Sequence, residues 1–207
     1  MNPIVQLEEK ISDFFGSPYA VAVDCCTHGL ELCLRLLKEG DNPTFDYQYT
    51  CPNRTYLSVP MTFEKLNLDW NFTNQHWSEY YSIGNTNIYD AAVMWRKNSY
   101  IPSTMMCVSF QLKKHLSLGK GGVILLDNEE DAEILRQIRY DGRPELESPW
   151  ASQQIQLFGY HYQMTYETAQ MGIDKFADAV AREPKQWTWK DYPDLSKYEI
   201  FKRGVLH

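Results

Sequence analysis

The sequence lacks an excess of basic residues and a long apolar run, and each absence argues against a class of protein. Its 20 Lys and Arg stand against 27 Asp and Glu, which gives a formal net charge of −7. Nucleic-acid binders normally carry a basic face, so this balance argues against one. No apolar run approaches the roughly 20 residues of a membrane-spanning helix. The first ten residues show no cationic leader followed by an apolar stretch. We therefore expect a cytoplasmic protein that contacts neither nucleic acid nor a membrane.

The cysteines also lack the spacing of a metal site or a disulfide framework. There are five of them, an odd number, and none forms a Cys-x-x-Cys pair. Cys25 and Cys26 are neighbours, and a disulfide between neighbours is strained. We expect reduced thiols, a reducing compartment and no metal ion.

Short apolar runs predict the strands of a buried sheet, with helices between them. The predicted strands are 19–23, 104–110 and 123–126, and 87–90 has the composition of a strand end. The predicted helices cover 4–15, begin near Thr27, cover 129–139 after a cap at Asp127 or Asn128, and begin after Thr165. Strands that alternate with helices are typical of an α/β fold with a mostly parallel sheet.

Two stretches give weaker patterns. Residues 46–81 are rich in aromatic residues and favour loops, and the Trp- and Tyr-rich tail after Pro184 gives no assignment. A chain of 207 residues can bury the core of one α/β domain but not of two full domains.

The segment 108–126 places three lysines between two predicted strands. A lysine at the mouth of a sheet is partly desolvated, which favours the neutral, nucleophilic amine that Schiff-base chemistry needs. A solvated hairpin with a cationic loop explains the same residues equally well.

This segment resembles the lysine motif of the DegT/StrS family of sugar aminotransferases, a branch of the fold-type I pyridoxal-phosphate enzymes. The family pattern is approximately Phe-Ser-Phe-x-x-x-Lys-Asn-Leu-x-x-Gly-x-Gly-Gly, and this chain has Val108-Ser-Phe-Gln-Leu-Lys-Lys-His-Leu-Ser-Leu-Gly-Lys-Gly-Gly122. The resemblance implies that Lys114 forms the Schiff base with the cofactor and that Ser109 contacts its phosphate. Lys113 takes the lysine's place if the register slips by one residue. A slip the other way puts His115 there, and some dehydratases of the family carry His instead of the lysine.

The stretch Tyr19-Ala-Val-Ala-Val-Asp-Cys-Cys-Thr-His-Gly-Leu30 resembles the strand–Ser-Gly-Thr–helix element that holds the cofactor phosphate in this family. The resemblance implies phosphate contacts from Cys26, Thr27 and His28. Helix physics agrees, because free amides and the positive end of the helix dipole attract a dianion. Taken alone, Thr27 is better explained as a helix cap.

Two further segments imply contacts with the pyridine ring. Cys51-Pro-Asn-Arg-Thr-Tyr-Leu-Ser58 resembles the family's Pro-Ser-x-Thr-(Phe/Trp) element, which places Tyr56 against the flat face of the ring. Ile88-Tyr-Asp-Ala-Ala92 resembles Ile-Glu-Asp-Ala-Ala, which pairs Asp90 with the ring nitrogen. That pairing keeps the ring protonated and able to accept electrons. Ordinary packing explains a tyrosine, and a strand-end turn explains the aspartate, when either is considered alone.

Gly159-Tyr-His-Tyr-Gln-Met-Thr165 resembles Gly-Tyr-Asn-x-Arg-Met-Ser, whose Asn reaches the phosphate of the neighbouring subunit in the family. His161 takes that place here, which implies a homodimer with shared sites. The chain departs from the family pattern at four positions: Val93 stands for His or Gln, Cys26 for Gly, His161 for Asn and Gln163 for Arg. These departures leave substrate specificity and turnover open.

The resemblance implies a three-layer αβα fold with a mostly parallel mixed sheet, in an unusually short, truncated form. We expect a compact cofactor-binding domain over 1–183 and a tail over 184–207 that is the remnant of a small subdomain. The implied function is transfer of an amino group from an amino acid such as glutamate to a nucleotide-linked keto-sugar, with pyridoxal 5'-phosphate as the cofactor. Three alternatives stay open: a relative that binds cofactor or sugar without transamination, another reaction of the same cofactor such as dehydration or decarboxylation, and a plain α/β domain.

Overall fold

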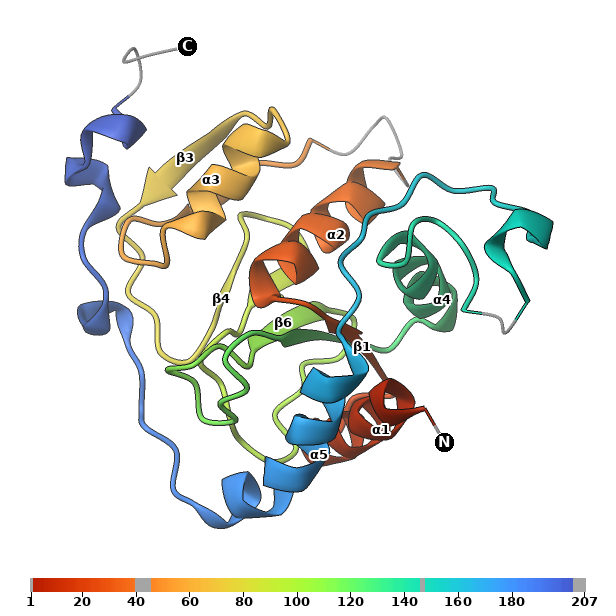
Figure 1. Cartoon of the computed structure of the whole chain (residues 1–207). Coiled ribbons are helices and arrows are strands. Elements are labelled where there is room, and N and C mark those ends of the chain that lie inside the picture. The colour runs from red at the N-terminus through yellow and green to blue at the C-terminus, as the bar shows by residue number, and fades with distance from the viewer. Residues whose placement is uncertain (1, 40–45, 146–147, 203–207) are drawn as a thin grey trace.

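The computed structural model describes residues 2–39, 46–145 and 148–202, which form a sheet covered by helices on both faces (Figure 1). The helices are α1 (Pro3–Phe15), α2 (Cys26–Glu39), α3 (Ser58–Lys65), α4 (Glu129–Ile138) and α5 (Tyr166–Ala181). The strands are β1 (Tyr19–Val23), β2 (Tyr49–Pro52), β3 (Trp70–Thr73), β4 (Tyr81–Ser82), β5 (Ile88–Asp90), β6 (Met105–Ser109) and β7 (Gly122–Leu126). Single 3₁₀ turns are η1 (Trp150–Ser152), η2 (Trp189–Asp191), η3 (Leu195–Lys197) and η4 (Glu199–Phe201). A search of these described residues finds no helix with the length and apolarity of a membrane span.

The main sheet has five strands in the order β1-β7-β6-β5-β4, and β2 pairs with β3 in a separate parallel ribbon. Only β5 and β6 are parallel neighbours; the other three pairings of the main sheet are antiparallel. The mixed α/β sheet is confirmed, but the prediction of mostly parallel pairing is wrong. The reason is that β7 returns directly after the loop that follows β6 and lies between β6 and β1. As a result β1, β5 and β6 still run in one direction and end at the same edge of the sheet.

Alternation along the strands produces the three layers. Val21, Cys107 and Ile124 face a core shared with α2, α3 and α4. Ala22 and Leu125 face the opposite core, which α1 and α5 cover. Successive side chains of a strand point to opposite faces, so each predicted apolar strand contributes to both cores.

Local capping fixes the helix ends. The side chain of Asn128 accepts the backbone N–H of Asp131 at 3.0 Å and begins α4, and Thr165 accepts from Thr168 at 3.2 Å and begins α5. Gly16 ends α1 with φ 75°, a left-handed conformation that favours glycine. The predictions of helix starts at Asn128 and Thr165 are confirmed.

One buried ion pair ties α1 to the end of α4. Arg139 is fully buried and donates through Nη1 to Glu8 Oε1 and to the carbonyl of Ala22, each at 2.5 Å. Its Nη2 donates to Glu145 at 2.7 Å. Glu8 in turn accepts the backbone N–H of Ala22 at 2.8 Å. This network holds the end of β1, which leads into the turn before α2.

The prediction of loops over 46–81 is wrong, because this stretch contains β2, α3, β3 and β4. The tail runs along one edge of the molecule from α5 to the side of β3 (Figure 1). Its end is placed there by Phe201, whose ring contacts Trp70 and Phe72.

Candidate functional site

A cavity of about 390 Å³ opens at the edge of the sheet where β1, β5 and β6 end. Its volume falls in the range of roughly 300–1,000 Å³ that is usual for small-molecule sites. The lining residues are Cys25, Cys26, Thr27, Leu30, Tyr56, Ser58, Val59, Asp90, Ala92, Ser109, Gln111, Lys113, Lys114, Trp187, Asp191 and Tyr192. Six of the eight site residues predicted from the sequence are therefore brought together: Cys26, Thr27, Tyr56, Asp90, Ser109 and Lys114.

Lys114 lies on the loop that joins β6 to β7, and its side chain is half-buried in the cavity. Nζ donates to Tyr192 Oη at 3.4 Å and lies 5.4 Å from the centre of the Trp187 ring. Burial lowers the pKa of Lys114, while the negative charge of Asp90 acts in the opposite direction. Lys113 also lines the cavity, but it is exposed. Of the two lysines, Lys114 is the one whose amine is desolvated.

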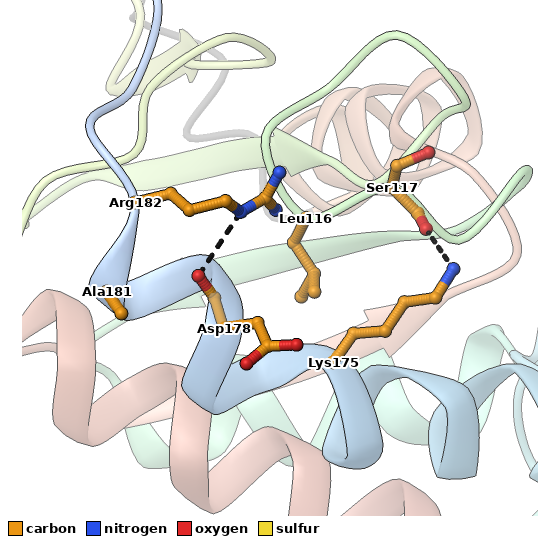
Figure 2. A pocket seen from close by; sticks show the side chains of 6 residues that line it. All are labelled: Leu116, Ser117, Lys175, Asp178, Ala181 and Arg182. Carbon is orange, nitrogen blue, oxygen red and sulfur yellow. Dashed lines mark hydrogen bonds between the residues drawn. The ribbon is translucent and has the colours of Figure 1, made fainter.

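The loop that carries Lys114 is held against α5 by hydrogen bonds to its backbone. Lys175 donates to the carbonyl of Ser117 at 3.0 Å, and Arg182 donates to the carbonyl of His115 at 3.1 Å. Figure 2 shows the pocket between this loop and α5, with Lys175 reaching the carbonyl of Ser117 and Arg182 donating to the backbone carbonyl of Asp178. The ring of His115 contacts the carbonyl of Ala179 at 2.7 Å and points away from the cavity at Lys114.

Asp90 is the last residue of β5 and is buried. Its Oδ2 accepts from the hydroxyl of Tyr81 at 2.5 Å, and its Oδ1 accepts from the N–H of Ala92 at 2.9 Å. Tyr81 also hydrogen-bonds to Thr55. Burial raises the pKa of Asp90, whereas Tyr81, Ala92 and the positive charge of Lys114 lower it. A cation in the cavity therefore favours the ionised carboxylate.

The first turn of α2 forms another wall of the cavity. The hydroxyls of Thr27 and Ser58 lie 2.8 Å apart. The N–H groups at the start of a helix have no acceptor within that helix, and they attract anions. Gly122 lets β7 approach this turn, since a Cβ there would lie 2.6 Å from the backbone nitrogen of Cys26. The Cys26 thiol donates to the carbonyl of Cys107 at 3.5 Å, so its side chain is directed into the protein.

His28 does not line the cavity, although the sequence predicts that it contacts phosphate. Its Nδ1 lies 2.6 Å from Asp24 Oδ1, and its ring stacks on Tyr162 at 3.6 Å. The pKa of His28 is about 9: burial opposes the rise, but hydrogen bonds to Asp24 and Cys25 more than offset it. Asp24 also pairs with Lys120 at 2.7 Å. His28 is one helical turn after Asp24, and this pairing turns its ring to the outside of the cavity.

His161 also lies away from the cavity. Its side chain is 84% exposed and contacts Asp141 at 3.2 Å. The sequence predicts a contact of His161 with a second subunit, and that prediction stays open.

Sequence reasoning missed Tyr81 and the tail residues Trp187, Asp191 and Tyr192. Tyr81 lies in the stretch where the sequence favours loops, and the tail gives no periodic pattern. Its aromatic richness was the one signal that the tail packs against something.

Comparison with known proteins supports the resemblance. Residues 101–188 match the model of the DegT/DnrJ/EryC1/StrS aminotransferase family, a range that includes the Lys114 loop and α5. The resemblance to this family predicted from the sequence is thus confirmed. No curated protein matches the sequence.

Solved structures share the fold at low sequence identity. AtS13 from Actinomadura melliaura superposes with a TM-score of 0.72 at 17% identity, over 88% of this chain and 61% of that one. Helicobacter pylori PseC, an aminotransferase involved in pseudoaminic acid biosynthesis, gives 0.68 at 12% identity, over 87% and 59%. GDP-4-keto-6-deoxymannose-3-dehydratase gives 0.66 at 15% identity, over 87% and 61%. The predicted α/β fold of fold-type I pyridoxal-phosphate enzymes is confirmed, and the chain spans about three fifths of the length of these structures.

Proposed function

We propose that this chain binds pyridoxal 5'-phosphate at Lys114 and transfers an amino group from an amino acid such as glutamate to a nucleotide-linked keto-sugar. The observation that carries the proposal is that a desolvated amine and a buried carboxylate, Lys114 and Asp90, face one cavity. Perturbed titratable groups that converge in a cavity are typical of catalytic sites.

The residues present fit this cofactor. Hydroxyls of Thr27, Ser58 and Ser109 and the amino end of α2 line one side of the cavity, which suits a phosphate. Asp90 suits a protonated ring nitrogen, because its buried carboxylate needs a positive partner. When bound, pyridoxal phosphate supplies an aldehyde that reacts with amines and a ring that accepts electrons.

The residues of this chain then have distinct tasks. Lys114 would hold the cofactor through Nζ. With the amino donor in the cavity, Nζ would move a proton at the donor's α-carbon, as general base and acid. Asp90 would hold the ring nitrogen, and Tyr81 orients Asp90 by donating to Oδ2. Tyr56, which lines the cavity, would pack against the flat face of the ring.

A homodimer with shared sites is part of the proposal. Its support is the exposed side chain of His161, which is free of the cavity of its own chain and is presented at the surface. Residues 1–183 form the cofactor-binding domain in this proposal. The tail belongs to the same site, because Trp187, Asp191 and Tyr192 line the cavity.

A dehydration at the same cofactor is the second candidate, because a dehydratase is among the structures that share the fold. Some dehydratases of the family carry His in place of the lysine, whereas here Lys114 faces the cavity and His115 contacts the carbonyl of Ala179 on α5. A protein that binds the cofactor without turnover would use the same residues.

Covalent attachment of the cofactor tests the lysine. Purified protein is incubated with pyridoxal phosphate, its visible absorbance is recorded, and the adduct is trapped with borohydride and located by mass spectrometry. We expect the label on Lys114, loss of the label in Lys114→Ala, and its retention in the control Lys113→Ala. Absence of a label in the wild type, or an unchanged label in Lys114→Ala, contradicts the proposal.

A screen of amino donors then separates the reactions. Conversion of the bound cofactor to its aminated form by glutamate or another amino acid supports transamination. Covalent binding at Lys114 with no conversion by any common amino acid indicates a protein that binds without transaminating. Loss of water from a keto-sugar, with no amino group retained in the product, indicates the dehydratase.

A further inference from the structure

The tail residues 187–192 form one wall of the cavity that contains Lys114. We propose that Tyr192 is a positioning residue for the Lys114 amine, held in place by this tail segment. The inference rests on the proposed role of Lys114 and extends it to a part of the chain whose sequence gave no assignment. Tyr192 lies 78 residues after Lys114, and its hydroxyl accepts the hydrogen bond from Nζ at 3.4 Å.

The tail is fixed to the domain by backbone hydrogen bonds on both sides of the cavity wall. The N–H of Glu79 donates to the carbonyl of Trp187, and the N–H of Trp189 donates to that of Trp77, each at 3.1 Å. Arg54 donates to the carbonyl of Tyr192 at 2.8 Å. These bonds reach the tail from the segment that carries Tyr56 and Tyr81. The wall is therefore built into the same framework as the rest of the site.

Side chains also fix the ring of Tyr192. Its centroid lies 5.5 Å from the ring of Trp77 and 6.1 Å from the ring of Trp187. Burial raises the pKa of Tyr192, and the negative charge of Asp90 adds to the rise. The hydroxyl therefore stays neutral over the physiological range, and it can accept from Lys114 without becoming a second buried charge.

Tyr192 is the group near Lys114 that fixes the position of its amine by a hydrogen bond. Asp90 at the end of β5 acts on Lys114 through its negative charge. Asp191 lines the cavity but pairs with Lys185 at 2.7 Å. Lys113, the adjacent cation in the loop, is exposed. Within the described part of the chain, Tyr192 is the hydrogen-bond acceptor of Lys114 Nζ, and the Trp187 ring flanks the amine at 5.4 Å.

Loss of this acceptor should change the pKa of Lys114 in a predictable direction. A hydroxyl oxygen stabilises an ammonium more than an amine, so Tyr192→Phe disfavours the charged form of Lys114. We expect the apparent pKa of Lys114 in the protein without cofactor to fall by roughly 0.5 to 1, the size of one modest hydrogen bond. The aromatic ring, and hence the packing on Trp77 and Trp187, is kept in this variant.

Competitive acetylation of cofactor-free protein measures this titration without any enzymatic activity. The protein is labelled with acetic anhydride at a series of pH values, and the extent of modification of Lys114 is read by mass spectrometry. Tyr198→Phe is the matched control, because Tyr198 is on the same tail, is 49% exposed and does not line the cavity. Arg54→Gln removes the anchor of the Tyr192 carbonyl and is expected to shift Lys114 in the same direction.

The outcomes distinguish a role of Tyr192 in positioning the Lys114 amine from a role in stabilising the fold alone. A Lys114 titration that moves in Tyr192→Phe and stays in Tyr198→Phe supports the proposal. A lower melting temperature of Tyr192→Phe with an unchanged Lys114 titration, or equal shifts in both variants, overturns it. If Tyr192→Phe fails to fold, Arg54→Gln decides by the same criterion. Failure of the wild type to attach pyridoxal phosphate at Lys114 rejects the proposed function instead, and it leaves the acetylation result standing.

Discussion

The buried pair of Arg139 and Glu8 gives the sharpest prediction about stability. Arg139→Met replaces the guanidinium by an apolar side chain and leaves Glu8 buried without its closest cation. Breaking a buried ion pair from one side costs about 3–5 kcal/mol. Arg136, which lies 3.6 Å from the other oxygen of Glu8, remains as a partial partner. We therefore expect a loss near the lower limit, about 3 kcal/mol, and a melting temperature lower by roughly 6–12 °C for a chain of this length.

Urea unfolding at pH 7, followed by far-ultraviolet circular dichroism, measures this loss. The double variant Glu8→Gln/Arg139→Met removes the buried charge of Glu8 together with that of Arg139, so it should be more stable than the sum of the two single variants predicts, by at least about 1 kcal/mol. Glu145 loses Arg139 in both Arg139→Met variants, so its contribution cancels in this comparison. Arg96→Met is the control, because the side chain of Arg96 is 58% exposed in its ion pair with Glu79, and a pair with a solvated partner contributes at most about 1 kcal/mol. The reasoning is wrong if Arg139→Met loses no more than Arg96→Met, or if the double variant is additive.

Two further changes test contacts at the start of α2. Gly122→Ala puts a Cβ against the backbone of Cys26, and we expect weaker binding of pyridoxal phosphate, measured by equilibrium dialysis; an affinity equal to that of the wild type would contradict the close approach. The pKa of His28, about 9 in the folded chain against an ordinary 6.5, means that its pairing stabilises the fold fully below pH 6.5 and loses this effect as the pH rises through 9. The difference in the free energy of unfolding between wild type and His28→Gln, measured with urea, should therefore shrink by roughly 1–3 kcal/mol from pH 6 to pH 10. A difference that is independent of pH would refute the pairing.

Much of the fold could be predicted because its central strands are short apolar runs. Residues 19–23, 105–109 and 122–126 form strands as predicted, since each is buried on both faces of the sheet. The prediction for the stretch 46–81 was wrong because its elements are two to eight residues long, too short for a hydrophobic period to repeat.

The site could be predicted where a local motif coincides with a strand end. Asp90 and Lys114 lie on different segments of the chain, yet both face one cavity, because β5 and β6 end at the same edge. Tyr192 could not be found, since its contact with Lys114 depends on a tail whose course is set by tertiary packing. His28 was predicted to contact phosphate, but the pattern contains no signal for the competing bond to Asp24 one helical turn earlier.

The pairing register of β5 and β6 sets the position of the Asp90 carboxylate relative to the Lys114 amine. Asp90 is in register with Cys107, and Ile88 shares its side of the sheet while Tyr89 packs on the other. Sliding β5 by a single position would present Tyr89 or Ala91 at the cavity and send the carboxylate through to the layer of α1 and α5. The register between β5 and β6 therefore determines whether Asp90 and Lys114 face the same cavity. An insertion of one residue in either strand would misalign the site even if every side chain named here were kept.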